Sequence, residues 1–192
     1  MADMPRWEQG AEDRLREAAL QLFLEHGYEN VTVAQITERA GLTRRTFSRY
    51  FADKRDVLFA GSERLPAALA DAVRSADAAL TPFEALLGAL ERVGDAVADR
   101  AAPHAAQRQS IIDASAELQE RGRTKFAAVT DALGEALRQR GATPSSAGLL
   151  ANVGVAVFRT AFGRWVDDPD AAALSARIRE AADELARELD GR

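Results

Sequence analysis

The chain of 192 residues contains no cysteine. This absence excludes disulfide bonds, thiolate nucleophiles and cysteine zinc sites. The two histidines, His26 and His104, lie far apart in the chain, so a histidine-rich metal site is difficult to build. A Gly-rich phosphate loop, an HExxH spacing and an evident nucleophile–base pair are also missing. We therefore expect no metal site, no cofactor, no catalytic residues and no enzymatic activity.

Long apolar runs are absent as well. No segment approaches the roughly 18 consecutive apolar residues that are typical of a membrane span. The N-terminal stretch, MADMPRWEQGAEDR, is polar and acidic and does not resemble a signal peptide. We expect a cytoplasmic protein with no membrane partner.

Strand-like alternation is missing too, whereas alanine, leucine, glutamate and arginine are abundant and favour helices. The predicted fold class is all-α. A first helix is expected from Trp7 to His26, ended by Gly27. The last two helices are expected at about 144–166 and 169–189, with the acidic pair Asp167 and Asp168 capping the final one.

The segment 33–52, VAQITERAGLTRRTFSRYFA, has the pattern of a helix–turn–helix. Thr32 and Gln35 form a capping box at the start of its first helix, and Gly41 ends that helix. Thr43 caps a short second helix that runs to about Phe51. A further helix is expected to begin near residue 54 and to kink or break at residue 66, joining the module to the rest without a flexible linker.

Charge is distributed unevenly along the chain. The net charge is −5, but the segment 39–55 carries +5, which leaves −10 for the remainder. Its six cations oppose a single acid, Asp53; they are Arg39, Arg44, Arg45, Arg49, Lys54 and Arg55. An acidic protein with one basic stripe is typical of contact with a polyanion. A solvated helix face is the alternative interpretation of charge alone.

The helix after Thr43 has two distinct faces. Phe47 and Phe51 are one turn apart and fall together on the face that packs inward. The opposite arc can enter a major groove, where an arginine can bind guanine O6 and N7 through two hydrogen bonds. Flanking hydroxyls and a lysine suit phosphate contacts, as does the start of a helix. The candidate DNA-binding residues are Thr32, Thr43, Arg44, Arg45, Thr46, Ser48, Arg49, Tyr50 and Lys54.

The run EAALQLFLEHGYENVTVAQITERAGLTRRTFSRYFADKRDVLFA resembles the DNA-binding domain of the tetracycline-repressor (TetR) family. The matching positions are Leu22, Phe23, Gly27, Tyr28, Thr32, Ile36, Ala40, Gly41, Thr46, Phe51, Lys54 and Leu58. The resemblance implies an all-helical homodimer of about nine helices per chain, which binds a palindromic double-stranded operator and holds a small molecule in its variable body. Two positions depart from the family pattern: Ser48 stands where tyrosine is usual, and Thr37 where alanine is more common.

The remainder of the chain predicts a helical body. Residues 149–166 are apolar nearly all round, which indicates burial on all sides. A second subunit could supply that cover through a four-helix bundle; packing on the chain's own core is the alternative. The predicted dimer interface is Val153, Val157, Phe158, Leu174, Ile178 and Leu185.

Aromatic and polar residues of the body describe either a small-molecule site or an ordinary core. The candidate pocket residues are His104, Gln107, Arg108, Phe126, Phe158, Phe162 and Trp165. The predicted organisation is a DNA-binding domain at 7–55 and a helical ligand-binding and dimerisation domain at 56–192.

The resulting hypothesis is a ligand-responsive transcriptional regulator, a repressor that an apolar or amphipathic effector releases from its operator. The alternative is a helical DNA-binding regulator that acts as an activator or without a small-molecule effector. A purely structural helical dimer is disfavoured, because such a module needs no basic helix.

Overall fold

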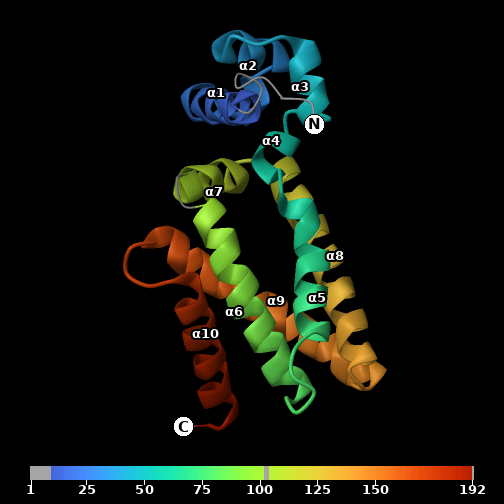
Figure 1. Ribbon diagram of the computed structural model, residues 1–192. Helices are drawn as coiled ribbons and strands as arrows, with labels where there is room; N and C mark the ends of the chain where they lie inside the picture. The colour runs from blue at the N-terminus through green and yellow to red at the C-terminus, as the bar shows by residue number, and fades with distance from the viewer. Residues whose placement is uncertain (1–9, 102–103, 192) are drawn as a thin grey trace. The chain divides into compact units, whose positions relative to one another are not determined.

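The computed structural model describes residues 10–101 and 104–191, and in these residues the fold is all-helical, as predicted. The predicted start of the first helix at Trp7 lies outside the described residues. Ten α-helices are present, of which nine have seven or more residues. They are α1 (Ala11–His26), α2 (Val33–Ala40), α3 (Arg44–Tyr50), α4 (Asp56–Phe59), α5 (Leu65–Arg74), α6 (Pro82–Ala101), α7 (Ala105–Asp113), α8 (Ala116–Gln139), α9 (Pro144–Asp167) and α10 (Leu174–Leu189) (Figure 1).

The chain forms two compact units whose boundaries differ from the expected division at residue 55. The first unit comprises the chain up to Ser62 together with Gln107–Glu120, and the second comprises Glu63–Ala106 and the chain from Arg121 onward. We call the first, which contains the residues predicted to bind DNA, the DNA-reading unit, and we call the second the body. The end of α7 and the start of α8 thus pack with α1–α4, although they lie far away in sequence. We call Gln107–Glu120 the docking segment.

Local capping explains why α2 and α3 begin where they do. The Thr32 hydroxyl accepts a hydrogen bond from the Gln35 amide at 3.3 Å, and the Gln35 side chain accepts from the Thr32 amide at 2.8 Å, which confirms the predicted capping box. Gly41 ends α2 in the left-handed conformation (φ 63°, ψ 38°), where a Cβ would be strained. Thr43 then caps α3 by accepting from the Thr46 amide at 3.1 Å.

The core of the DNA-reading unit fixes the orientation of α3. The rings of Phe47 and Phe51 are only 1% and 3% exposed, and their centroids lie 5.4 Å apart. They pack in one cluster with Leu15 of α1 and Ile36 of α2, both fully buried. Burial of each such side chain stabilises the fold by roughly 1.5–3 kcal/mol. The predicted inward face of α3 is therefore confirmed.

The expected helix from residue 54 onward is interrupted sooner than Pro66. Asp53 accepts hydrogen bonds from the backbone amides of Arg55 and Asp56, as a cap should, but α4 ends already at Phe59. Gly61 follows with φ 81°, which a helix cannot accommodate. A short 3₁₀ turn, Ser62–Arg64, leads into α5, where Pro66 occupies the first turn and needs no amide donor. The predicted break is therefore present, but it lies at Gly61 instead of Pro66.

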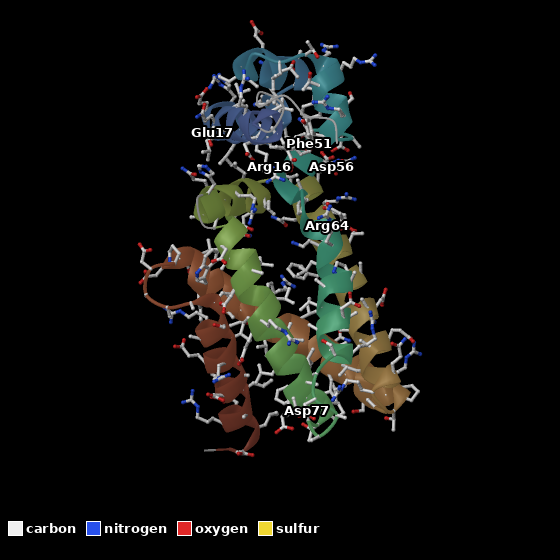
Figure 2. All side chains as sticks on the ribbon, in the orientation of Figure 1. Arg16, Glu17, Phe51, Asp56, Arg64 and Asp77 are labelled. Atoms are coloured by element: carbon white, nitrogen blue, oxygen red, sulfur yellow. The ribbon has the colours of Figure 1, made fainter. Side chains whose placement is uncertain are left out.

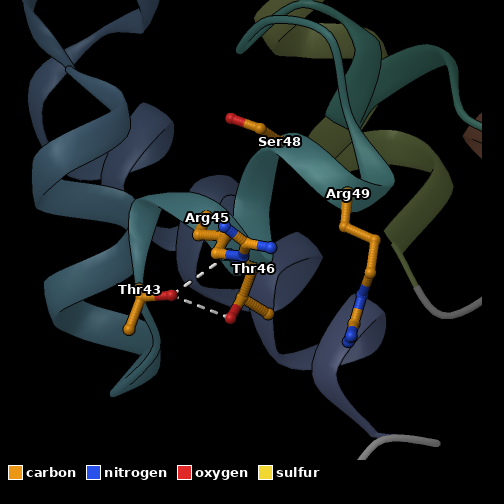
Figure 3. A pocket seen from close by; sticks show the side chains of 5 residues that line it. All are labelled: Thr43, Arg45, Thr46, Ser48 and Arg49. Carbon is orange, nitrogen blue, oxygen red and sulfur yellow. Dashed lines mark hydrogen bonds between the residues drawn. The ribbon is translucent and has the colours of Figure 1, made fainter.

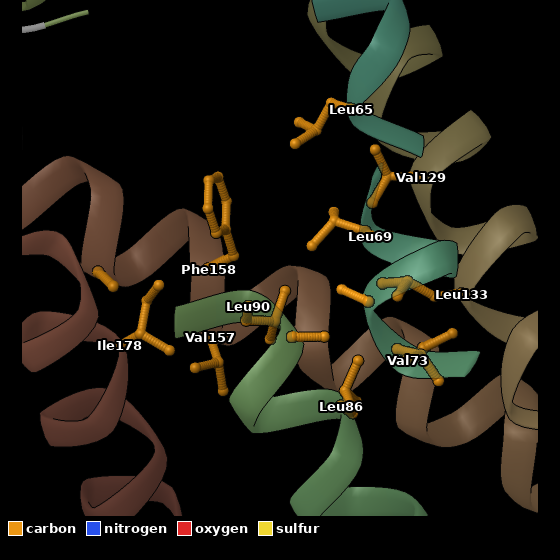
Figure 4. Close-up of a cluster of buried hydrophobic side chains, with 14 of the residues drawn as sticks. Leu65, Leu69, Val73, Leu86, Leu90, Val129, Leu133, Val157, Phe158 and Ile178 are labelled. Atoms are coloured by element: carbon orange, nitrogen blue, oxygen red, sulfur yellow. The ribbon is translucent and has the colours of Figure 1, made fainter. Parts of the chain in front are cut away.

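The body is held together by close helix packing around small residues. In Figure 1, α6 and α10 run side by side and α9 crosses behind them. A Cβ on Gly154 of α9 would lie 2.9 Å from Leu86 of α6, and one on Gly94 of α6 would lie 2.7 Å from Ile178 of α10. These glycines let the helix backbones approach. Leu86, Leu90, Leu133 and Ile178 are among the buried side chains of this cluster (Figure 4).

Helix α9 begins at Pro144, as expected, after a Thr143 cap, and in the single chain it is not buried on all sides. An 18-residue window within it has a mean hydropathy of 1.2, yet only 33% of that window is buried. By length and composition such a helix could cross a membrane, and the core helices of soluble proteins share this property. Ala151 and Gly154 face the core, while Leu149 is 66% exposed.

The final helix starts later than the predicted residue 169. Asp168 ends α9 instead of capping α10, which begins at Leu174. The residue before α10, Ala173, offers no side-chain cap. A carboxylate from α6 takes this role, because Asp95 Oδ1 accepts a hydrogen bond from the Ser175 amide at 2.9 Å. Such a cap comes from 80 residues away and is invisible to local sequence patterns.

Candidate nucleic-acid interface

The outward face of α3 carries the predicted polar residues. Arg44, Arg45, Ser48 and Arg49 are exposed, opposite the buried Phe47. A hollow of about 510 Å³ opens on this surface, lined by Thr43, Arg45, Thr46, Ser48 and Arg49 (Figure 3). Five of the nine candidate DNA-binding residues therefore lie together on one surface, and Arg44 precedes them at the start of the helix.

The three arginines of α3 differ in their surroundings. Arg44 and Arg45 make no hydrogen bond or ion pair with any residue in the described ranges. Arg49 instead donates from Nη2 to the Tyr50 hydroxyl at 3.0 Å, with its guanidinium carbon 4.9 Å from the centre of the tyrosine ring. Two guanidinium groups at the N-terminal end of the helix can therefore accept an outside partner without breaking an internal contact.

The threonines that flank the arginines serve the fold as well. The hydroxyls of Thr43 and Thr46 lie 3.0 Å apart, and each can donate to the other. The exposed Thr32 hydroxyl likewise holds the first turn of α2. Hydroxyl groups at the exposed N-termini of two consecutive helices suit contact with phosphate, since helix N-termini favour anions.

Lys54, a predicted phosphate contact, binds backbone carbonyl oxygens of its own unit in this structure. Its ammonium donates to the carbonyl oxygens of Tyr28 at 2.8 Å, Val31 at 3.0 Å and Glu29 at 3.4 Å. It also lies 4.2 Å from the centre of the Tyr28 ring. An ammonium has three donors, and here all three are directed at the turn between α1 and α2. Lys54 thus stabilises that turn rather than facing outward.

Two further cations of the basic stripe are bound within the DNA-reading unit. Arg39 forms a two-pronged pair with Glu25 at 2.9 and 2.7 Å, which ties α2 to α1. Arg55 binds Asp53 and, at 3.0 Å, Glu117. Hydrogen bonding from Arg55 holds the pKa of Asp53 below its ordinary value of 3.8. Of six cations counted in the sequence, the three on α3 remain directed outward.

The docking segment is a part of this unit that sequence patterns did not reveal. Ile111 and Leu118 are buried in its hydrophobic cluster. The buried Ser115 hydroxyl donates to Glu29 at 3.0 Å, and Glu117 receives Arg55. Ile111 lies near the end of α7 and Leu118 near the start of α8. Local sequence patterns do not indicate which residues these apolar side chains contact, so only the tertiary structure identifies this packing.

The predicted pocket residues separate into two groups. Phe126, Phe158, Phe162 and Trp165 all belong to the body cluster. Phe162 stacks on Phe158 with centroids 6.0 Å apart and contacts Trp165 at 5.6 Å. His104 and Gln107 are exposed, and Arg108, with Gln107, lies in the docking segment of the other unit. A hollow of about 430 Å³ elsewhere in the body is polar and includes the pair Glu91–Arg179.

The predicted dimer residues also divide. Val157, Phe158, Leu174 and Ile178 are buried within the body of a single chain, with exposures of 6%, 6%, 0% and 0%. In the single chain their contacts are therefore internal. Val153 and Leu185 are partly exposed, and their neighbours Leu149 and Leu189 are exposed by 66% and 79%. The most exposed apolar side chains on α9 and α10, Leu149 and Leu189, thus lie one helical turn from the predicted interface residues Val153 and Leu185.

Within residues 10–101 and 104–191, no group of three His, Asp or Glu side chains lies close enough together to hold a metal ion. The outer surface of α3 carries exposed arginines and hydroxyls. These groups can bind anions and hydrogen-bonding partners.

Comparison with known proteins identifies this arrangement. Residues 15–60 match the model of bacterial regulatory proteins of the tetR family. The chain is 38% identical over 87 residues to the HTH-type transcriptional regulator TcmR of Streptomyces glaucescens; the alignment covers 45% of this chain and 38% of TcmR. The chain thus spans well under half the length of that curated relative.

Solved structures share the whole fold. SmeT of Stenotrophomonas maltophilia, in complex with triclosan, is 23% identical with a TM-score of 0.61, covering 92% of this chain and 90% of SmeT. The repressor FadR of Thermus thermophilus, in complex with lauroyl-CoA, is 25% identical with a TM-score of 0.50, covering 92% and 93%. The segment 15–60 thus resembles bacterial regulatory proteins of the tetR family, and the chain shares its overall fold with these solved structures.

Proposed function

We propose that this protein is a cytoplasmic transcriptional regulator that binds double-stranded DNA through the outer face of α3. The observation that carries the proposal is the pair Arg44 and Arg45, exposed at the start of a capped helix and without an internal partner in the described chain. The buried Phe47 and Phe51 hold the opposite face of that helix in the core. A rigid helix with free guanidinium groups at its N-terminal end suits base edges in a major groove.

The neighbouring hydroxyls complete the interface. Thr32, Thr43 and Thr46 stand at the first turns of α2 and α3, where phosphate contacts would fix the register of the protein on DNA. Tyr50 and Ser48 extend the same surface. Ser48 is exposed in the hollow of Figure 3, so the short side chain leaves room beside Arg45 and Arg49 for a base or a water molecule.

The test is a set of binding measurements on sites selected from a random DNA pool. Arg45→Ala should lose about 1–3 kcal/mol of binding free energy on the selected site and relax its base preference. Arg39→Ala removes the same charge from a residue that Glu25 already binds, and it should leave base preference unchanged. Equal losses in both variants, or no binding by the native protein at low salt, would refute the assignment.

A homodimer would place two α3 helices on a palindromic operator. Two half-sites about one helical turn apart, roughly 34–36 Å, require two recognition helices on a two-fold axis. The exposed apolar side chains of α9 and α10, foremost Leu149 and Leu189, offer surface that a second copy would bury. Partly exposed Val153 and Leu185 belong to the same helices.

Sedimentation equilibrium can measure the association. Leu149→Glu should weaken it, since a carboxylate would enter an apolar interface. Leu24→Glu is a matched control, because Leu24 is 46% exposed on α1, which belongs to the other unit. A monomeric native protein, or equal weakening by both substitutions, would contradict this part of the proposal.

The body is proposed to bind an apolar or amphipathic small molecule that releases the protein from DNA, so that the protein acts as a repressor. Support comes from the aromatic group around Phe162 and Trp165, and from two cations, Lys125 and Arg159, that lie 5.4 Å from the Phe126 ring centre. The complexes of SmeT with triclosan and of FadR with lauroyl-CoA support the same type of ligand.

The docking segment offers a route for such a release. Helix α8 begins in the docking segment and continues into the body. Ser115 and Glu117 of the docking segment bind Glu29 and Arg55 of the same unit. A ligand that favours a different position of α8 would alter these contacts.

Triclosan is a suitable probe: it should change the fluorescence of Trp165 and lower operator affinity, and Trp165→Phe should remove the fluorescence change. Unchanged operator affinity with saturating triclosan would exclude that compound class.

A further inference from the structure

The C-terminus of α2 has to be capped before the chain turns into α3, because the last carbonyl groups of a helix have no amide partner within it. The Gly41 amide donates to the Glu38 carbonyl at 3.0 Å, and the Leu42 amide donates to the Thr37 carbonyl at 2.8 Å. These two hydrogen bonds close the turn from within. Neither of them reaches the carbonyl of Ala40, the last residue of α2.

Arg14 of α1 supplies the donor for this carbonyl. Its Nη2 donates to the Ala40 oxygen, 26 residues away in the sequence. The same nitrogen would lie 3.1 Å from a Cβ built on Gly41, so the guanidinium fills the space beside the turn. A cation at this end of α2 also opposes the negative partial charge of a helix C-terminus. Arg14 therefore ties the end of α2 to α1 immediately before the turn.

The position of the turn matters for the residues at the start of α3. Only Gly41–Thr43 separate α2 from α3. The buried Phe47 and Phe51 anchor the C-terminal half of α3, whereas its first turn, which carries Arg44 and Arg45, has no buried side chain. A binding constellation has to be held within about 0.5 Å of its productive geometry. The placement of the two arginines therefore depends on the turn that precedes them.

We propose that Arg14 is a positioning residue of the DNA interface: by capping α2 from α1, it fixes the turn and thereby the base discrimination by Arg44 and Arg45. The inference rests on the proposed function. Direct contact with a DNA phosphate is the alternative role for this exposed cation. Loss of a phosphate contact weakens binding to all sequences and reduces its salt dependence, whereas loss of positioning lowers the preference for the selected site.

Equilibrium binding of Arg14→Gln to the selected site and to a scrambled site of equal length separates the two roles. The ratio of the two affinities should fall by about fivefold or more, the equivalent of one weakened base contact. The slope of log K against log salt on the scrambled site should stay at the native value, whereas loss of a phosphate contact would reduce it by about 0.9.

Arg16→Gln is the matched control for the affinity ratio. Arg16, labelled in Figure 2, lies on the same helix as Arg14 and carries the same charge, but it pairs with Glu12 of α1 itself. The control substitution removes a cation from α1 without removing a link to α2, so it should keep the native ratio.

Hydrogen exchange of the Gly41 and Leu42 amides, measured on the full chain without DNA, gives a second readout. Both amides donate to carbonyls in the last turn of α2. In Arg14→Gln they should exchange about fivefold faster, the equivalent of one lost hydrogen bond, and in Arg16→Gln at the native rate. Arg14→Lys keeps the charge but replaces the planar guanidinium, so its affinity ratio should follow its exchange rate and not its charge.

The outcomes separate this inference from the proposed function. A native protein without preference between the two sites would refute the proposed function and this inference with it. A native preference that Arg14→Gln retains would overturn this inference alone. So would a reduced salt slope in Arg14→Gln, native exchange at Gly41 and Leu42, or an Arg14→Lys protein in which only one of the two readouts is native.

Discussion

Different kinds of contact stabilise the DNA-reading unit and the body, each within itself. The first depends on individual polar groups, such as the Thr32 capping box and the Lys54 ammonium with its three carbonyl acceptors. The body depends on shape, because Gly94 and Gly154 allow helices to approach within contact of Leu86 and Ile178. Polar contacts require particular residue types at particular positions, whereas helix packing accepts many apolar sequences of suitable volume.

This difference explains which part of the chain matches the family model. The family model matches residues 15–60, which include most of α1, all of α2–α4 and the Lys54 contact, and it does not extend over the body. The body nevertheless shares its fold with SmeT at 23% identity. A fold maintained by interlocking volumes can persist while its sequence changes, and the contrast can be tested by substitutions in each unit.

The largest effect is expected from Lys54→Ala. The substitution leaves three carbonyl oxygens without their donor and removes the cation beside the Tyr28 ring, so stability should fall by about 2–3 kcal/mol. Urea unfolding followed by circular dichroism measures the change. Ser48→Ala, on the exposed face of α3, serves as control and should stay within about 0.5 kcal/mol. A Lys54→Ala protein of native stability with weaker DNA binding would restore Lys54 as a phosphate contact.

Gly154→Ala should have a somewhat smaller effect in the body. The added methyl would lie 2.9 Å from Leu86 Cδ2, so the fully buried Leu86 side chain would have to shift against its neighbours. Overpacking of this kind costs about 1–3 kcal/mol. Gly163→Ala is the matched control on the same helix, since nothing lies within 4 Å of its Cβ position, and it should be neutral or slightly stabilising. Equal stabilities of the two variants would remove the argument that α9 requires close approach at Gly154.

A pH effect is expected from the pair Asp53–Arg55. Because Arg55 lowers the pKa of Asp53 in the folded state, the carboxylate contributes stability that is complete above the ordinary value of 3.8. That contribution is lost as the pH falls through the lower folded pKa. The side chain is 37% exposed, so the effect should remain below about 1 kcal/mol. Asp53→Asn should flatten the dependence of Tm on pH below about pH 4; an unaltered slope would contradict the pairing.

The smallest effect is expected from Tyr28→Phe. The Tyr28 hydroxyl is buried without a hydrogen-bond partner in the described chain, and burial raises its pKa. Removing it should change stability by no more than about 0.5 kcal/mol and in the stabilising direction, while the ring remains beside Lys54. Loss of more than 1 kcal/mol, about the value of one hydrogen bond, would show that the hydroxyl has a partner in solution.

Features set by neighbouring residues could be predicted from the sequence. The capping box of Thr32 and Gln35, the turn at Gly41 and the inward pair Phe47 and Phe51 involve residues within four positions of each other. Helical periodicity and capping geometry act over that range. The same periodicity predicts that the arginines face outward. The sequence therefore predicts both the helical structure of α3 and the face that it exposes.

Features that depend on distant partners could not be predicted. The three acceptors of Lys54 lie 23 to 26 residues away, and Ser115 reaches Glu29 across 86 residues. The late start of α10 depends on Asp95 of α6, and four of the six residues predicted for the dimer interface are buried within the single chain. A helical pattern states which side chains share a face, but not which surface covers that face.

The sequence by itself therefore determined the helical class, the boundaries of α2 and α3, and the side of α3 that faces outward, because these depend on backbone capping and on the 3.6-residue period. Only the tertiary structure decided which cations remain available and which serve the fold. Arg44 and Lys54 carry the same charge ten positions apart, yet the first has no internal partner in the described chain and the second has three. Charge is a property of the residue, whereas its availability depends on the acceptors that folding brings within hydrogen-bond distance.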